Sequence, residues 1–349
     1  MELKKKERIN SLDVIRTIAV LAVVMIHVSA MFVVNTEGNV EIFLIGNIFD
    51  SISRIGVPLF VMVSGALMLD ENKQITLKQI IFKYLLNIII LFLVWSIFYS
   101  IFNNVLIPFV KKETINIKSV IISIFNGNYH MWYLFMIVGL YLITPILRLF
   151  VKKENSGIIL WFVFLSLFFQ FLVPVIDFLA NLNTAFTFIH TLLDKIDLDF
   201  VGGFTTYYLL GWYIAHVGFN KKAQTCLYIM GGISIVATII ATQIFPTQYG
   251  NTYSNMNILI LLYSVAVFLL IFNTYKKGTK LDIFFENTSS LAFGVYIIHP
   301  FLLSVYGFIF PQEYTLGYLL LEWLIVTLFS FGITFLITKI PFIKKIVRG

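Results

Sequence analysis

Ten long apolar runs, separated by short polar segments, dominate the pattern of this chain. A helix that crosses a bilayer needs about 20 consecutive apolar residues, and each run approaches or exceeds that length. The runs are continuous and do not alternate between apolar and polar positions, so they predict helices and not barrel strands. The predicted spans are 11–34, 41–69, 80–107, 130–150, 157–179, 202–219, 224–245, 255–274, 289–310 and 316–340.

The composition requires a lipid environment for these runs. Hydrophobic residues make up 59% of the 349 residues and charged residues only 12%, about half the charged fraction of soluble domains. In hydrocarbon the backbone must satisfy its own polar groups, as a helix does. We therefore predict an all-α, polytopic membrane bundle of about ten transmembrane helices. It forms a single membrane-embedded domain over residues 1–349, with no appended soluble domain.

The basic residues predict how the spans are oriented. With a cytoplasmic N-terminus and ten spans, 19 of the 25 Lys and Arg residues fall in cytoplasmic segments and four in outer loops. This imbalance follows the positive-inside rule and places both termini in the cytoplasm. These cytoplasmic Lys and Arg clusters account for the net charge of +7. They form no continuous basic stripe, so the charge does not indicate a nucleic-acid partner. The longest outer segments, 108–129 and 180–201, are either connectors or covers over an outward-facing site.

The sequence lacks the motifs of several functional classes. Cys226 is the single cysteine, which excludes an intramolecular disulfide and a multi-cysteine metal site. No metal-ligand spacing, Walker loop, dinucleotide motif or nucleophile elbow is present, so we expect neither a metal nor ATP-driven transport.

Ionisable residues inside the predicted spans are the main candidates for function. Each costs about 2.5–3.5 kcal/mol at the centre of a membrane helix, so such residues are rarely placed there without a role. The seven candidates are Asp13, Arg16, His27, Arg54, His130, His299 and Glu322.

Three of these residues share one face of the first span. Arg16 and His27 are 11 positions apart, which is about three turns, about 16 Å and a difference in direction of about 20°. Asp13 and Arg16 are one i,i+3 step apart and can pair. The arrangement suits a substrate that enters from the cytoplasm and reacts near the outer leaflet. The structural alternative is an Asp13–Arg16 pair at the membrane edge and a hydrogen-bonded packing role for His27.

The other candidates also allow two interpretations. His130 lies among aromatic residues that form either an interfacial belt or part of a site. Arg54 either pairs with Glu322 as a structural clamp or holds an anionic group. His299 either stabilises a kink at Pro300, where the helix loses a backbone hydrogen bond, or belongs to a site.

Several motifs occur in the order found in a known family. The first is Ser11-Leu12-Asp13-Val14-Ile15-Arg16, followed by Val24-Met25-Ile26-His27. Next come Val57-Pro58-Leu59-Phe60 with Ser64-Gly65, and His130-Met131-Trp132-Tyr133-Leu134 leading to Tyr141-Leu142-Ile143-Thr144-Pro145. The last is Tyr296-Ile297-Ile298-His299-Pro300. Together, across nearly the whole chain, they resemble the acyltransferase-3 family of membrane acyltransferases, in particular its membrane-domain-only, glycan O-acetyltransferase-like members.

The resemblance implies transfer of an acyl group, usually acetyl from acetyl-CoA, to a hydroxyl of a cell-surface glycan or its lipid-linked precursor. It also implies that His27 is the catalytic histidine and that Arg16, beside Asp13, helps to bind the acyl-CoA. Residue chemistry agrees, because Arg16 can attract phosphates and His27 can act as a general base. Arg54, His130, Glu322 and His299 are candidates for oxyanion stabilisation or for the acceptor site.

Two other functions use the same residue types. A proton-coupled transporter or flippase for a glycan or lipid-linked sugar also needs intramembrane His, Arg and Glu residues, but it need not bind acyl-CoA. A scaffold subunit leaves the polar face of the first span unexplained. The expected partners are acyl-CoA, the sugar acceptor and membrane lipids. The abundance of Lys, Asn, Ile and Phe suggests an AT-rich bacterial genome, and hence a multi-pass protein of the bacterial plasma membrane.

Overall fold

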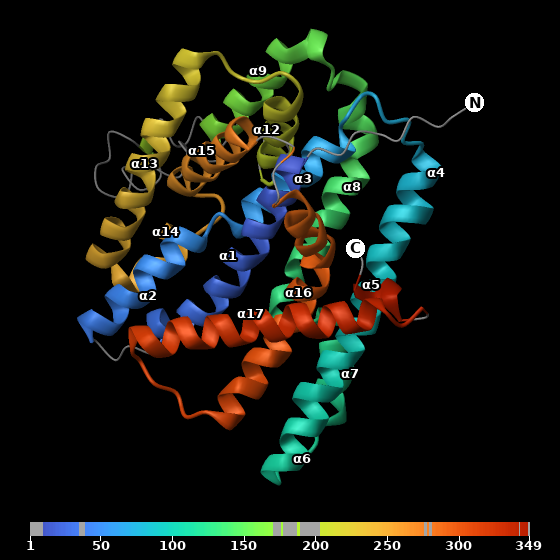
Figure 1. The fold of residues 1–349 in the computed structure, drawn as a ribbon, viewed down its shortest axis with the longest axis vertical. Helices are drawn as coiled ribbons and strands as arrows, with labels where there is room; N and C mark the ends of the chain where they lie inside the picture. Colours follow the sequence, from blue (N-terminus) through green and yellow to red (C-terminus); the bar gives the residue numbers. More distant parts are fainter. Residues whose placement is uncertain are drawn as a thin grey trace. The chain divides into compact units, whose positions relative to one another are not determined.

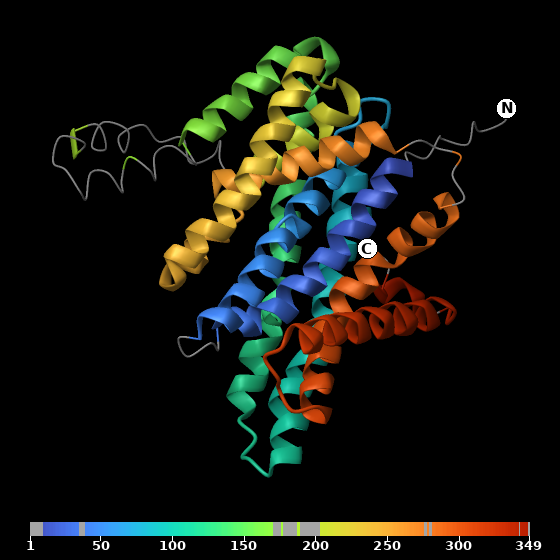
Figure 2. The ribbon, with the colours of Figure 1, turned by 60° about the vertical axis from the view of Figure 1, so that its left-hand side comes forward.

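A computed structural model describes residues 10–34, 39–169, 176, 187–188, 203–275, 278, 281–341 and 343–347. These residues form helices and turns, and none of them lies in a strand (Figures 1 and 2). The chain divides into two compact units: unit 1 comprises Met1–Lys73 and Leu147–Ser289, and unit 2 comprises Gln74–Ile146 and Ser290–Gly349. The all-α prediction is therefore confirmed for the described residues.

Unit 1 holds the first span and the helices that pack around it. Helix α1 packs against α2, α3 and α15, and α13 packs against α15 and α2 (Figure 2). The helices of this unit are α1 (Asn10–Val34), α2 (Val40–Ser53), α3 (Gly56–Met68), α9 (Ser156–Leu167), α12 (Thr205–His216), α13 (Lys221–Ile244), α14 (Tyr249–Thr252) and α15 (Ile258–Thr274).

The second predicted span, 41–69, is broken near its middle. Helix α2 ends at Ser53 and α3 begins at Gly56, and Pro58, in the first turn of α3, has no backbone N–H to donate. The hydroxyl of Tyr263 donates to the carbonyl oxygen of Ile52 at 3.3 Å. A side chain thereby satisfies a carbonyl group beside the break, as the membrane interior requires.

Helices α3 and α12 cross with almost no space between their backbones. A Cβ atom added to Gly65 would lie 1.9 Å from the carbonyl oxygen of Tyr208, and one added to Gly211 would lie 2.0 Å from that of Met62. Small residues permit such close approach between membrane helices. The Ser64-Gly65 motif therefore has a packing role at this crossing.

Unit 2 contains the later polar candidates. It includes α4 (Leu77–Gln79), η1 (Ile80–Leu85), α5 (Leu86–Ile101), η2 (Phe102–Leu106), α6 (Ile107–Lys111), α7 (Ile117–Asn126), η3 (Tyr129–Met131), α17 (Leu316–Thr338) and η8 (Lys344–Val347). Helices α8 (Trp132–Phe150) and α16 (Asp282–Ile309) contribute residues to both units.

The predicted outer segment 108–129 is largely helical. Helix α7 occupies much of this segment, and the Asn116 side chain begins it by accepting hydrogen bonds from the backbone N–H groups of Lys118 and Ser119. Helix α7 packs on α5 through serine contacts, including Ser100 Oγ to the Val120 carbonyl at 2.7 Å. These hydrogen bonds give the segment a fixed partner. The other expected loop, 180–201, lies outside the described residues apart from 187–188.

Seven helical segments of the described chain are long and apolar enough to cross a membrane. They are Asn10–Val34, Val40–Met68, Leu77–Lys111, Ile117–Phe150, Lys221–Ile244, Asp282–Ile309 and Leu316–Thr338, and Ile258–Thr274 is a shorter apolar helix. These segments support a multi-pass membrane protein. The count of ten spans and the cytoplasmic placement of both termini stay predictions.

Candidate functional site

Helix α1 carries Asp13, Arg16 and His27 within one uninterrupted element, as their shared face requires. Asp13 is buried, and its Oδ1 accepts a hydrogen bond from Ser289 Oγ at 2.6 Å. Arg16 and His27 are partly exposed. The start of α1 is thus fixed to α16 within unit 1, while Arg16 and His27 remain partly accessible.

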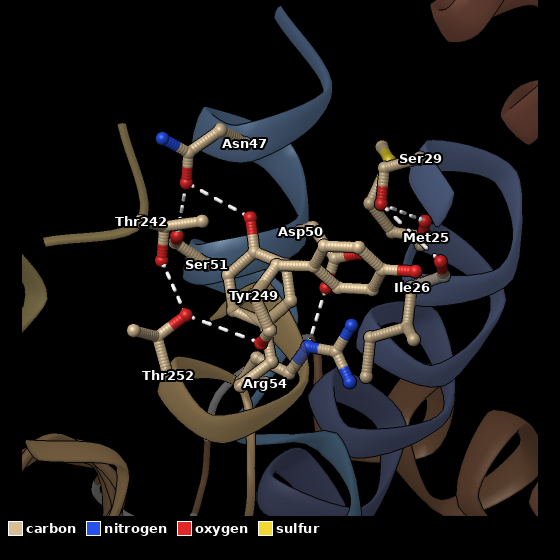
Figure 3. Close-up of polar contacts among 11 residues, drawn as sticks. Met25, Ile26, Ser29, Asn47, Asp50, Ser51, Arg54, Thr242, Tyr249 and Thr252 are labelled. Atoms are coloured by element: carbon tan, nitrogen blue, oxygen red, sulfur yellow. Dashed lines mark hydrogen bonds and ion pairs between the residues drawn. The ribbon is translucent and has the colours of Figure 1, made fainter. Parts of the chain in front are cut away.

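Arg54 lies at the break between α2 and α3 and forms an ion pair with Asp50 (Figure 3). Its Cζ atom lies 4.3 Å from the centroid of the Tyr253 ring, within the range of a cation–π contact. The Asp50 side chain is 1% exposed and the Arg54 side chain 22%. Arg54 is therefore held on one side by a carboxylate and on one face by an aromatic ring.

A hydrogen-bond network holds Tyr253 in place. Its hydroxyl donates to Asn47 Oδ1 at 2.9 Å, and Ser51 Oγ donates to the same atom at 2.9 Å. The amide nitrogen of Asn47 in turn donates to the Ile239 carbonyl oxygen at 2.9 Å and to Gln243 Oε1 at 3.1 Å. Burial raises the pKa of Tyr253, so its hydroxyl remains a donor. The network links α2 to α13 and to the segment before α15.

His130 and His299 come together in unit 2. Both side chains are buried, and their ring centroids lie 5.8 Å apart. The His130 ring also lies against Tyr99, Tyr129 and Tyr296, at centroid distances of 5.1, 5.5 and 5.5 Å. The sequence placed these histidines in separate motifs, and the fold joins them in one aromatic cluster.

A tyrosine hydroxyl is inserted into α16 at Pro300. Tyr99 donates its hydroxyl hydrogen to the Ile297 carbonyl at 2.7 Å and accepts a hydrogen bond from the Phe301 N–H at 3.2 Å. His299 Nδ1 donates to the Val295 carbonyl at 3.2 Å. The helix opens beside Pro300, and Tyr99 bridges the opening.

Glu322 is also buried in unit 2, on α17. One of its carboxylate oxygens, Oε2, has no hydrogen-bond partner among the described residues. The structure pairs Arg54 with Asp50. A pair between Arg54 and Glu322 stays a prediction, because the two residues belong to different units.

The sequence reading missed several residues of these clusters. Asp50 had a local signal, because it is four residues before Arg54 and can pair with it on one helix face. Tyr253 and Ser289 had none, since they reach their partners across about 200 and 276 residues of chain. Over the described residues, no group of three or more His, Cys, Asp or Glu side chains could hold a metal ion.

Helices that can cross a membrane, with ionisable residues along them, define a multi-pass membrane protein. The chain belongs to the acyltransferase-3 family, because the family model described as an acyltransferase domain matches residues 9–339. It is also similar to an "Amino-acid racemase" of Enterococcus faecalis, with 26% identity over 341 residues. That match covers 93% of this chain and 45% of the relative, so the chain spans about half the length of that protein. No solved structure matches.

Proposed function

We propose that this protein transfers an acetyl group from acetyl-CoA, or another acyl group from its CoA thioester, to a hydroxyl of a cell-surface glycan or lipid-linked sugar. The family match over residues 9–339 carries the proposal, because the matching family model describes an acyltransferase domain. The placement of Arg16 and His27 on one side of α1 supports it. The proposed location is the bacterial plasma membrane.

In the proposed reaction His27 is the general base. The imidazole takes the proton of the acceptor hydroxyl, and the hydroxyl oxygen attacks the thioester carbonyl carbon. The resulting oxyanion needs a hydrogen-bond donor, for which Arg54 and His130 are candidates. When the carbon–sulfur bond breaks, the CoA thiolate leaves and takes up a proton, and the acyl group remains on the acceptor oxygen.

Arg16 is proposed to bind the anionic CoA. A guanidinium forms charge-assisted hydrogen bonds with phosphate oxygens, and Arg16 lies about 16 Å before His27 along α1. This separation allows one helix to bind the donor at one depth and to present the base at another. Asp13, held by Ser289 at 2.6 Å, fixes the end of the helix that carries Arg16.

The proposal is tested by acetyl-CoA binding to the purified protein in detergent. We compare the wild type, Arg16→Ala, His27→Ala and the control Lys221→Ala, which removes a cation at the start of α13. Saturable binding that Arg16→Ala weakens and Lys221→Ala preserves supports the proposal. Binding without transfer in His27→Ala supports a role in the chemistry. A folded wild type that binds neither acetyl-CoA nor a longer acyl-CoA contradicts it and leads to transport assays in proteoliposomes.

A further inference from the structure

The Asp50–Arg54 pair has unused hydrogen-bonding groups on both partners. Arg54 uses Nε for Asp50 and one face for Tyr253, while its Nη1 and Nη2 atoms have no partner among the described residues (Figure 3). The carboxylate oxygen Oδ2 of Asp50 is buried and, beyond the neighbouring Ser29 hydroxyl, has no hydrogen-bond partner within that part of the chain. Buried polar atoms are rarely left unsatisfied in folded proteins. The buried Asp50 carboxylate therefore has an acceptor atom to offer a ligand, and the Nη atoms of the partly exposed Arg54 can donate to the same ligand.

The pair lies at the same depth along α1 as His27. A Cβ atom added to Gly46 would lie 2.6 Å from Phe32 Cβ, and one added to Gly56 would lie 2.9 Å from Val23 Cγ2. The segment from Gly46 to Gly56 therefore runs antiparallel to the α1 segment from Phe32 back to Val23. Asp50 and Arg54 lie within the first segment, and His27 lies within the second. Figure 3 draws the pair with Met25, Ile26 and Ser29 of α1.

The chemistry of the pair selects a neutral ligand with hydroxyl groups. An anion attracted by Arg54 meets the negative charge of Asp50, and a cation attracted by Asp50 meets Arg54. A hydroxyl group avoids both conflicts, because it accepts a hydrogen bond from a guanidinium and donates one to a carboxylate. Neighbouring hydroxyls on one molecule can bind both partners at once, as those of a sugar do.

We propose that Asp50 and Arg54 form the subsite that binds the hydroxyl groups of a neutral sugar acceptor. The inference rests on the proposed acyl transfer and names the residues that bring the acceptor to the depth of His27. Tyr253 and Asn47 are positioning residues: the Tyr253 ring covers the guanidinium at 4.3 Å, and Asn47 Oδ1 accepts the tyrosine hydroxyl at 2.9 Å. They restrict Arg54 so that Nη1 and Nη2 remain available to the acceptor.

The test separates the acceptor from the acyl donor by measuring two reactions of acetyl-CoA. One is transfer to a panel of methyl glucoside, methyl galactoside, methyl mannoside and N-acetylglucosamine. The other is hydrolysis, in which water replaces the acceptor. The variants are Asp50→Asn, Arg54→Lys and the double variant Asp50→Asn/Arg54→Gln, which removes both charges together and avoids leaving one buried alone. Thermal denaturation of each variant confirms that it is folded.

We expect the ratio of transfer to hydrolysis to fall by about tenfold or more in these variants, since each loses hydrogen bonds to a charged group. The loss appears mainly as a higher KM for the sugar. Tyr253→Phe, which keeps the ring, raises this KM less than Tyr253→Leu, which loses ring and hydroxyl. The control Tyr228→Phe removes a tyrosine hydroxyl on α13 whose partner is Asn273, and it leaves the ratio unchanged.

Three results overturn parts of the account in distinguishable ways. If hydrolysis falls in parallel with transfer, Arg54 acts on the thioester and the acceptor subsite is rejected. If the wild type hydrolyses acetyl-CoA but acetylates no member of the panel, the assignment to a neutral sugar is rejected while the acyltransferase function stands. If the folded wild type neither binds nor hydrolyses acetyl-CoA, the proposed function itself fails.

Discussion

The Asp13 carboxylate is fixed by a residue 276 positions away in the chain. Ser289 donates to it at 2.6 Å, and one turn along α1 the hydroxyl groups of Thr17 and Thr288 lie 2.9 Å apart. Side-chain hydrogen bonds therefore join the start of α1 to α16 within unit 1. Because these hydrogen bonds hold the start of α1, the position of Arg16 depends on α16.

Replacement of Ser289 tests the hydrogen-bonded contact between α1 and α16. Ser289→Ala leaves the buried Asp13 with one hydrogen bond fewer, which costs about 1–3 kcal/mol in the free energy of unfolding. Thermal denaturation in detergent measures the loss. The control Thr225→Ala removes a hydroxyl at an exposed position of α13, whose partner among the described residues is the carbonyl oxygen four residues earlier. Equal stability of the two variants contradicts a supporting role for Ser289.

Helical arithmetic predicted from the sequence alone that Asp13, Arg16 and His27 share one face of α1. The same helical spacing indicates that Asp50 and Arg54 can pair, because residues four positions apart lie on one helix face. Helical spacing does not predict the contacts of Tyr253 or Ser289, because these contacts depend on how distant helices pack. The sequence therefore indicates which residues carry charge, while the fold determines which groups hold them.

At the scale of elements, the apolar runs predicted helices well and their interruptions poorly. The run 41–69 was predicted as one span although polar residues gather at 50–54, and α2 and α3 are separate helices on either side of Arg54. Helix α7 was not predicted, because it lies in the segment 108–129 between two predicted spans. Its N-cap, Asn116, was the available signal.

The insertion of Tyr99 into α16 predicts a coupled effect of two substitutions. Tyr99→Phe removes two hydrogen bonds to the opened backbone and destabilises the protein by about 1–3 kcal/mol. In a Pro300→Ala background the helix can close, because the steric cause of the opening is gone. In that background Tyr99→Phe lowers the free energy of unfolding by a smaller amount. Thermal denaturation of the four proteins in this cycle measures the coupling, and additive effects contradict it.

The crossing of α3 and α12 predicts a strong requirement for glycine. Gly65→Ala and Gly211→Ala each place a methyl group about 2 Å from a backbone carbonyl oxygen of the other helix, and the helices must separate. We expect a large loss of folded protein by size-exclusion chromatography. The control Gly232→Ala adds a methyl group on α13 with nothing within 4 Å. A normal yield of both crossing variants contradicts this packing.

At the scale of the whole molecule, composition and the apolar runs predicted a multi-pass helical membrane protein. The family match over residues 9–339 agrees with the motifs found along the chain. The division into two units could not be predicted, because it depends on contacts between segments far apart in sequence. The number of spans and their orientation rest on the distribution of basic residues.

Labelling with a membrane-impermeant maleimide tests this orientation. In a Cys226→Ser background, which removes the single, exposed cysteine, the positive-inside rule predicts that Lys111→Cys is labelled in intact cells. Lys152→Cys is predicted to react only after the membrane is permeabilised. Both positions lie at exposed helix ends or turns. Reaction of Lys152→Cys in intact cells contradicts the predicted topology.

The most direct test of the central claim is acetyl transfer by His27→Asn, measured with acetyl-CoA binding on the same purified sample. A general base contributes about 10²–10⁴-fold to the rate, so transfer should fall by at least about 100-fold while acetyl-CoA still binds. That result supports His27 as the base of an acyltransferase. A folded His27→Asn protein that transfers acetyl groups at the wild-type rate contradicts the account.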